Sequence, residues 1–364
     1  MNSKFTMKVM SLFGTRPEII RLSRVFASLD ENFEHIMVNT SQNYTKELNS
    51  IFFEQLKIRK PDHDLKVKTE AYGKEVADII EKSEKLLKKE NPDILLILGD
   101  TNSGLAAITA AHQGIKIAHM EAGMRSYDFR MPEEKNRVII DHLSTVLLPY
   151  TQYSRENLIR ENIHPSKIFV TGNPIIEVID YYLPQIKKND ILRKLKLKKY
   201  DYFLVTAHRS ENVDNLDSLR NIFEGLEKIQ KKFKKKIMYP IHPRTLSKME
   251  RKIKIPQGIH IIEPLGFFEF SKLEQNAFCL ITDSGTIPEE TLYFKRPCIT
   301  IRESTERPET IEAGANILSG LQPQQMLDSV ETITSQKPSW EWNEVLGDGK
   351  TARKIVNILQ GNLY

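Results

Sequence analysis

The stretch KVMSLFGTRPEIIRLSRVFASLD, residues 8–30, contains a short apolar run, a polar turn and a segment with helical periodicity. Residues 9–13 have the length and composition of a buried strand. The segment after the turn repeats apolar side chains at the spacing of one helix face, at Ile19, Leu22, Phe26 and Leu29. Pro17 suits the first turn of that helix, where no intrahelical hydrogen bond is lost. The stretch therefore predicts a strand and a helix that packs on a sheet.

The same alternation of short apolar runs and helix-like segments occurs in two series along the chain. The first series comprises residues 9–13, 36–39, 94–98, 115–119, 146–149 and 168–171. The second comprises residues 203–206, 237–241, 259–262, 279–282 and 298–301. This pattern is typical of βαβ units and predicts an α/β fold with two Rossmann-like, doubly wound domains. Because such folds bind ligands at the carboxyl ends of their strands, we expect the site in a cleft that the two domains face.

The length of 364 residues also suits two domains. We expect an N-terminal domain over residues 1–180 and a C-terminal domain over residues 181–349. The polar, lysine-rich residues 181–201 are the expected link between them. The last stretch, KTARKIVNILQGNLY at residues 350–364, is a candidate amphipathic helix.

The composition argues against several classes of protein. No apolar run approaches the roughly 20 residues of a membrane helix, and the N-terminus lacks the apolar region of a signal peptide. We therefore expect a cytoplasmic protein without a membrane partner. Cys279 and Cys298 lie inside apolar runs and are expected in the core. The net charge of +5 slightly favours an anionic small molecule, and the lysine clusters lack the aromatic residues of a nucleic-acid partner's site.

Five polar stretches follow predicted strands: FGTRPE (13–18), GDTNSG (99–104), HMEAGMR (119–125), AHRSEN (207–212) and DSGTIPEE (283–290). In the last one, small residues from Ser284 to Thr286 precede a helix start at Pro288. Such a turn can cradle a pyrophosphate or serve as a plain helix cap. Arg16 could present its guanidinium group to phosphate. Arg302 and Arg307 add positive charge in the second domain.

The segment EAGMRSYDFRMPEEKNR, residues 121–137, holds many charged residues directly after a predicted strand. A helix start at Pro132 places Glu133 and Arg137 one turn apart, with Asp141 one further turn along the same face. Glu121 and Asp100 approach from neighbouring strand ends, so three carboxylates and an arginine are expected to converge. A solvated helix face with ion pairs is the alternative. Sequence spacing typical of metal ligands is absent around His119, His208 and His242, so no metal site is expected.

Together, the motifs from FGTRPEIIRL to TERPETIEAGANILSG resemble the non-hydrolysing UDP-N-acetylglucosamine 2-epimerase family over nearly the whole chain. The resemblance implies a GT-B-like arrangement of two Rossmann domains, the second binding UDP, with the C-terminal helix packed back on the first. It implies an isomerase that interconverts UDP-GlcNAc and UDP-ManNAc by eliminating UDP to give 2-acetamidoglucal and adding it back. It also implies a UDP-sugar partner, a homodimer and no cofactor.

The resemblance assigns roles to particular residues. The catalytic positions fall on Asp100, Glu121, Glu133, Arg137, which would hold Glu133, and His208. The substrate-binding positions fall on Arg16, Ser284, Gly285 and Arg307 at phosphate, Glu290 at ribose and Phe270 near uracil. A regulatory UDP-GlcNAc pocket found in bacterial members would map to Arg21, Gln42 and His242.

Other functions stay open at this point. The forms GDTNS, SYDFRMPEE and DSGTIPEE look closer to archaeal members and to a branch acting on 6-deoxy or diacetamido-uronate UDP sugars. The substituents at C3 and C6 of the sugar are therefore open. A hydrolysing epimerase would use the same elimination, and a GT-B glycosyltransferase would share the fold. A nucleotide-sugar sensor would keep the phosphate residues but would not need Asp100, Glu121 and Glu133 together.

Overall fold

The computed structural model describes residues 7–42, 46–68, 71–241, 243–249 and 253–361. Within them, the strands form two separate sheets of six parallel strands each. The chain divides into two compact units. Unit 1 comprises Met1–Tyr181 and Leu346–Tyr364, and unit 2 comprises Tyr182–Val345.

Unit 1 contains the first sheet. Its strands are β1 (Lys8–Phe13), β2 (Glu34–Asn39), β3 (His63–Asp64), β4 (Ile94–Leu98), β5 (Lys116–Met120) and β6 (Val146–Leu148). Its helices are α1 (Arg16–Asn32), α2 (Lys46–Gln55), α3 (Tyr72–Glu90), η1 (Asn102–Leu105), α4 (Ala106–His112), α5 (Pro132–Leu143), α6 (Gln152–Arg160), η2 (Pro165–Lys167), most of α7 (Pro174–Lys188), and α17 (Thr351–Gly361). The strand order is β3-β2-β1-β4-β5-β6, which is the order of a Rossmann sheet.

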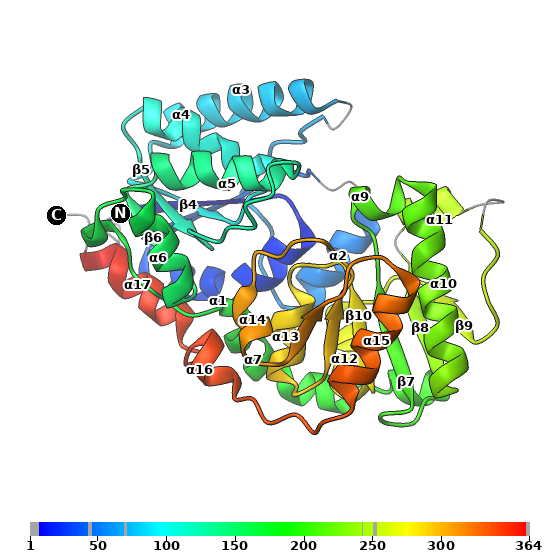
Figure 1. The fold of residues 1–364 in the computed structure, drawn as a ribbon. Helices are drawn as coiled ribbons and strands as arrows, with labels where there is room; N and C mark the ends of the chain where they lie inside the picture. Colours follow the sequence, from blue (N-terminus) through cyan, green and yellow to red (C-terminus); the bar gives the residue numbers. More distant parts are fainter. Residues whose placement is uncertain (1–6, 43–45, 69–70, 242, 250–252, 362–364) are drawn as a thin grey trace. The chain divides into compact units, whose positions relative to one another are not determined.

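Helices cover both faces of the first sheet. Figure 1 shows α3, α4 and α5 on one side of it and α1 and α17 on the other. Ile79 of α3, Ala110 of α4 and Ile140 of α5 are fully buried against β1 and β4. On the other face α17 packs against α1, and its first turn is fixed because the amide of Ala352 donates to Glu177 at 2.8 Å. The sheet is therefore a buried layer, and only the ends of its strands reach the surface.

Unit 2 repeats this architecture. Its strands are β7 (Tyr202–Thr206), β8 (Lys236–Pro240), β9 (Ile259–Ile262), β10 (Cys279–Thr282), β11 (Cys298–Thr300) and β12 (Asn316–Leu318). Its helices are the end of α7, α8 (Ile191–Lys194), α9 (Ser210–Val213), α10 (Leu216–Phe233), α11 (Pro243–Met249), α12 (Phe267–Asn276), α13 (Ile287–Tyr293), α14 (Pro308–Glu312), α15 (Pro323–Thr334) and α16 (Trp342–Leu346), which ends at the return to unit 1. The strand order β12-β11-β10-β7-β8-β9 is again that of a Rossmann sheet, so the predicted fold class is confirmed.

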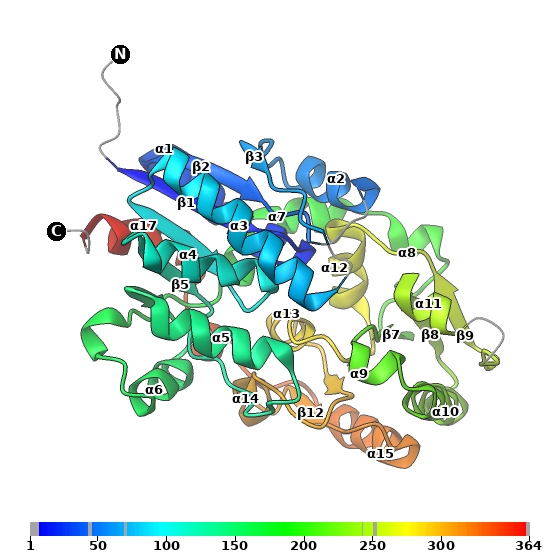
Figure 2. The ribbon, with the colours of Figure 1, turned by 90° about the horizontal axis from the view of Figure 1, so that it is seen from above.

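The second sheet is also covered on both faces. Helices α10 and α15 lie side by side on one face, as Figures 1 and 2 show, and bury Ile222 and Met326 there. Helices α12 and α13 cover the other face with Leu273 and Ile287. Cys279 and Cys298 lie in this core without a disulfide, as expected from the sequence.

Each sheet has one topological switch point, where the strand order reverses. In unit 1 it lies between β1 and β4, and in unit 2 between β7 and β10. Ligands of open α/β sheets bind at this position because the connections on either side run to opposite faces. The turns after β1 and β4 carry Arg16 and Asp100, and the turns after β7 and β10 carry His208 and Ser284.

Two predictions about the elements were wrong. Residues 168–171 are not a strand, because only Ile168 forms an isolated bridge, to Leu147. The edge strands β3 and β12 were missed because they have only two and three residues. The expected link at residues 181–201 begins where the two units divide, at Tyr181 and Tyr182, and it contains the end of α7 and α8.

Candidate active site

Arg137 of α5 joins two carboxylates that come from different strand ends. Its Nη2 donates to Glu121 Oε1 at 3.1 Å and also to Asp100 Oδ2. Asp100 follows β4 and Glu121 follows β5, and these strands are neighbours in the sheet. The Arg137 side chain is 2% exposed, so the guanidinium group is shielded from water where it meets the two acids. The predicted convergence of Asp100, Glu121 and Arg137 is thus present within unit 1.

Arg21 of α1 binds the same glutamate from the other side. Its Nη1 donates to Glu121 Oε2 at 2.6 Å, and its side chain is 2% exposed. Two buried guanidinium groups therefore hold Glu121, and they stabilise its anionic form. Glu121 also has a left-handed backbone with φ of 67°, which is unfavourable for a residue with a side chain and persists only where contacts fix it.

Glu133 does not form the ion pair with Arg137 that the family resemblance implies. It is half-buried in the first turn of α5, and its carboxylate makes no hydrogen bond or ion pair with any other described residue. The reason is that Arg137 points to the interior, where Asp100 and Glu121 offer less solvated partners. The adjacent Glu134 is buried instead and accepts hydrogen bonds from the amides of Ser126 and Tyr127, which fixes the loop before the helix.

Arg16 lies in the first turn of α1 at the switch point of unit 1. It is half-buried, and burial lowers the pKa of its guanidinium group. Among the described residues it has no hydrogen-bond or ion-pair partner. A partly desolvated cation of this kind favours an anionic ligand.

Two of the three residues expected in a regulatory pocket support the turns of unit 1. Arg21 pairs with Glu121, as described above. Gln42 accepts hydrogen bonds from the amide and the hydroxyl of Ser103, three residues after Asp100. His242 lies outside the described residues. A regulatory role for these positions stays a prediction.

In unit 2, Asp283 organises the loop that carries His208. Its buried carboxylate accepts hydrogen bonds from the amides of His208 and Arg209 and from the side chain of Asn212. The His208 ring stays 44% exposed, with Nδ1 3.6 Å from Asp283 Oδ1. The imidazole is therefore held at the end of β7 and remains accessible to a ligand.

Three arginines gather around Glu306 beside the Ser284–Gly285 turn. Arg302 and Arg307 lie 3.0 and 2.7 Å from its carboxylate oxygens, and Arg209 lies 3.5 Å away. Arg307 also donates to Glu289 at 3.2 Å. A Cβ atom at Gly285 would lie 2.5 Å from Glu306 Oε1, so only glycine allows the turn to approach this cluster. The turn and the basic cluster thus form one surface suited to an anion.

Two further expected ligand residues lie on the helices after β9 and β10. Glu290 of α13 is 8% exposed and faces the fully buried Glu274 of α12. Burial and the neighbouring Glu290 carboxyl both raise the pKa of Glu274 well above its ordinary value. The burial and the neighbouring carboxyl thus favour the neutral form of Glu274. Phe270 packs partly into the core of unit 2.

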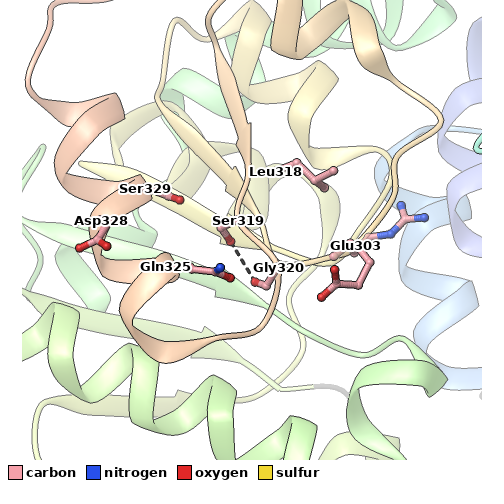
Figure 3. A pocket seen from close by; sticks show the side chains of 8 residues that line it. Glu303, Leu318, Ser319, Gly320, Gln325, Asp328 and Ser329 are labelled. Carbon is pink, nitrogen blue, oxygen red and sulfur yellow. Dashed lines mark hydrogen bonds between the residues drawn. The ribbon is translucent and has the colours of Figure 1, made fainter.

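A pocket of about 350 Å³ lies at the ends of β11 and β12, next to α15. Figure 3 shows the side chains that line it. Its lining is polar and includes Arg302, Ser319 and Gln325, but not Ser284, Gly285 or Arg307. Over the described part of the chain, no group of three His, Cys, Asp or Glu side chains could hold a metal ion. In the same part, no helix is both long and apolar enough to cross a bilayer.

Sequence reasoning missed several residues that shape these clusters. Arg21 was assigned elsewhere, and Asp283, Glu134 and Glu306 were given no role. Asp283 directly follows a predicted strand, so its position alone could have marked it as a site residue. Glu306 precedes Arg307 in the sequence, but no sequence pattern shows that its carboxylate forms ion pairs with three arginines.

Comparison with known proteins gives a consistent result. The family model described as UDP-N-acetylglucosamine 2-epimerase matches residues 27–360. The UDP-N-acetylglucosamine 2-epimerase of Methanocaldococcus jannaschii is 41% identical over 368 aligned positions, which cover 98% of this chain and 100% of that protein. The UDP-2,3-diacetamido-2,3-dideoxy-D-glucuronate 2-epimerase of Pseudomonas aeruginosa is 33% identical, with coverage of 97% and 99%.

A solved structure agrees with these relatives. The crystal structure of Methanocaldococcus jannaschii UDP-GlcNAc 2-epimerase in complex with UDP-GlcNAc and UDP matches with a TM-score of 0.93. The identity is 41%, and the match covers 98% of this chain and 100% of that one. The family resemblance seen in the sequence motifs is therefore confirmed: the chain belongs to the UDP-N-acetylglucosamine 2-epimerase family.

Proposed function

We propose that this protein interconverts UDP-GlcNAc and UDP-ManNAc by inverting C2 of the sugar. The observation that carries the proposal is the cluster of Asp100 and Glu121 around Arg137, with Glu133 on the same helix as Arg137. A protein that only bound a nucleotide sugar would have no need for several acids at one sheet edge. Membership of the epimerase family supports the same activity.

The chemistry accounts for the acids. The C2 hydrogen is next to no carbonyl group, so it becomes acidic only as the bond between C1 and the UDP oxygen breaks. We propose that this bond breaks while a base removes the C2 proton, giving 2-acetamidoglucal and UDP. A proton then adds to the opposite face of C2, and UDP forms the C1–O bond again. Carboxylates stabilise the positive charge that develops on the ring.

The contacts of the three acids suggest different roles. Glu121 is 7% exposed and held by two guanidinium groups, which suits an anion that stabilises the oxocarbenium-like ring. Glu133 has no partner among the described residues, which suits a group that gains and loses a proton. Asp100, at 19% exposure, is the proposed acid or base for the other face of C2.

We assign UDP to the residues of unit 2, with Arg16 of unit 1 as a further phosphate ligand. Ser284, Gly285 and Arg307 form the anion-binding surface described above and would take the diphosphate. His208 would stabilise the leaving phosphate oxygen as the C1–O bond breaks. Glu290 would accept the ribose hydroxyls and Phe270 would contact uracil, as the family resemblance implies. Assembly as a homodimer stays a prediction.

The substrate is best tested with purified protein and a panel of UDP sugars. We expect UDP-GlcNAc and UDP-ManNAc each to convert to the same equilibrium mixture, measured by chromatography. Preferred turnover of a 6-deoxy or diacetamido-uronate sugar would place the chain nearer the activity named for the Pseudomonas relative. Stoichiometric release of UDP and free sugar would indicate a hydrolysing enzyme, and no conversion of any donor would refute the proposal.

A further inference from the structure

Unit 1 contains a second set of titratable side chains in contact, the buried His119, Asp141 and Arg125 and the partly exposed Glu161. His119 is on β5 and Asp141 is on α5, and both side chains are fully buried. His119 Nδ1 lies 2.8 Å from Asp141 Oδ1. Arg125 lies 2.7 Å from Asp141 Oδ2 and 2.7 Å from Glu161 Oε2. Basic and acidic side chains alternate along these contacts, and we call the four residues the His119–Asp141 network.

The hydrogen bonds determine where the protons lie. His119 Nε2 is 2.8 Å from the carbonyl oxygen of Gly99, which can only accept, so Nε2 carries a hydrogen. Burial by itself would raise the pKa of Asp141, but His119 and Arg125 hold it below its ordinary value. Nδ1 therefore faces a carboxylate and must also donate. Both ring nitrogens of His119 are therefore in hydrogen-bond contact with an acceptor.

The network holds the backbone of the two turns that carry the acids. The bond from His119 fixes the carbonyl group of Gly99, one residue before Asp100. Asp141 Oδ2 accepts from the amide of Gly123 at 3.1 Å, two residues after Glu121. Gly99 and Gly123 both have a positive φ, of 73° and 76°. A side chain at Gly123 would also meet the Ser154 carbonyl oxygen at 2.2 Å.

Helix α5 links these contacts to the acidic cluster. Asp141 lies one turn after Arg137 on this helix. Asp141 contacts the turn at Gly123 directly and the turn at Gly99 through His119. Arg137 contacts the Asp100 and Glu121 carboxylates on the same two turns. Any shift of Asp141 would move the Gly99 and Gly123 backbone relative to Arg137. A misplacement of about 1 Å at a catalytic group can cost about a hundredfold in rate.

We propose that His119 and Asp141 are positioning residues, which set the place of the Asp100 and Glu121 carboxylates by holding the backbone of their turns. Neither side chain needs to touch the substrate. Their effect on turnover rests on the epimerase function proposed above, whereas their effect on the turns does not.

The matched pair of variants is Asp141→Asn and Glu161→Gln. Asparagine keeps the shape of Asp141 but removes its negative charge, and its amide nitrogen must face either His119 or the Arg125 and Gly123 donors. We expect kcat to fall by about 10- to 100-fold, with KM and the affinity for UDP within about threefold of wild type. Glu161 is 26% exposed at the outer end of the network, so its variant should keep kcat within about threefold.

Two readouts do not depend on turnover. Nitrogen-15 NMR should show both ring nitrogens of His119 protonated in the wild type and one deprotonated in Asp141→Asn. Hydrogen exchange at the Gly123 amide should be faster in the variant. If Asp141→Asn does not fold, His119→Gln replaces it, because glutamine can still donate to Gly99 but carries no charge. It should show the same loss of kcat.

The outcomes separate the two proposals. A folded Asp141→Asn variant with faster exchange at Gly123 and unchanged kcat would overturn the positioning role. A His119 ring without a hydrogen on Nε2 in the wild type would overturn it as well. The wild type could instead show no epimerase turnover while both His119 ring nitrogens carry hydrogens and the Gly123 amide is protected from exchange. This result would refute the proposed function, but the network would still fix the backbone of the two turns.

Discussion

Glu133→Gln should lower kcat by about a hundredfold or more while the thermal stability stays within about 1 °C of wild type. The large effect is expected because a lost acid or base typically costs about 10² to 10⁴ in rate. Stability should not change because the Glu133 carboxylate has no hydrogen bond or ion pair with another described residue. The measurement is steady-state kinetics with UDP-GlcNAc, together with a thermal melt.

The matched control for this prediction is Glu156→Gln. Glu156 is also a helical glutamate of unit 1, but it is 59% exposed and pairs only with Arg160, at 3.4 Å. Its variant should keep wild-type kinetics. Near wild-type kcat in Glu133→Gln would remove Glu133 from the mechanism. A large loss of stability instead would point to a structural role.

Arg137→Met should reduce both stability and turnover. Removal of one partner from a buried ion pair typically costs about 3–5 kcal/mol, because the remaining charge is left uncompensated. Here two carboxylates lose their shared cation, and Glu121 keeps its contact with Arg21. We expect a loss of that size in urea unfolding at pH 7. We also expect at least a hundredfold loss of kcat, since Asp100 would no longer be held in place.

The pH dependence of this variant has a definite sign. Without Arg137, Asp100 and Glu121 lose an ion-pair partner, so protonating them no longer breaks that pair. In the wild type the stabilisation by such a pair is lost only as its carboxylates bind protons, below about pH 4. The loss of stability in the variant is therefore greatest at neutral pH and shrinks as the pH falls toward about 3. Arg137→Lys keeps the charge but not the planar guanidinium geometry, so it should recover part of the stability. Equal destabilisation at pH 3 and pH 7 would contradict this account.

The sheets were the most predictable part of the fold. Buried parallel strands read as nearly continuous apolar runs, and β4 (Ile94–Leu98) and β10 (Cys279–Thr282) follow that rule. Edge strands of two or three residues carry too little pattern to be seen. The lysine-rich composition hid the end of α7, although Ile179, Tyr182 and Ile186 are buried at helical spacing there.

The sequence predicted which residue types lie at the strand ends of the site, but it did not predict which side chains contact one another. Sequence spacing placed Glu133 and Arg137 on one face of a helix, since residues four apart share a helix face. Only the structure shows that Arg137 turns toward Asp100 and Glu121. The contact of Arg21 with Glu121 joins residues 100 positions apart, which no local pattern can indicate. The two ring nitrogens of His119 likewise contact a distant carbonyl group and an aspartate on another element.

The most direct test of the account follows the C2 hydrogen. The proposed elimination removes this proton and returns one from the solvent or from an acid that exchanges with it. Turnover of UDP-GlcNAc in D₂O should therefore place one deuterium at C2 of both recovered epimers, seen by proton NMR and mass spectrometry. Epimerisation at an unchanged rate with no deuterium at C2 would show that the C2–H bond is never exposed to exchangeable protons, and would contradict the roles of Asp100, Glu121 and Glu133.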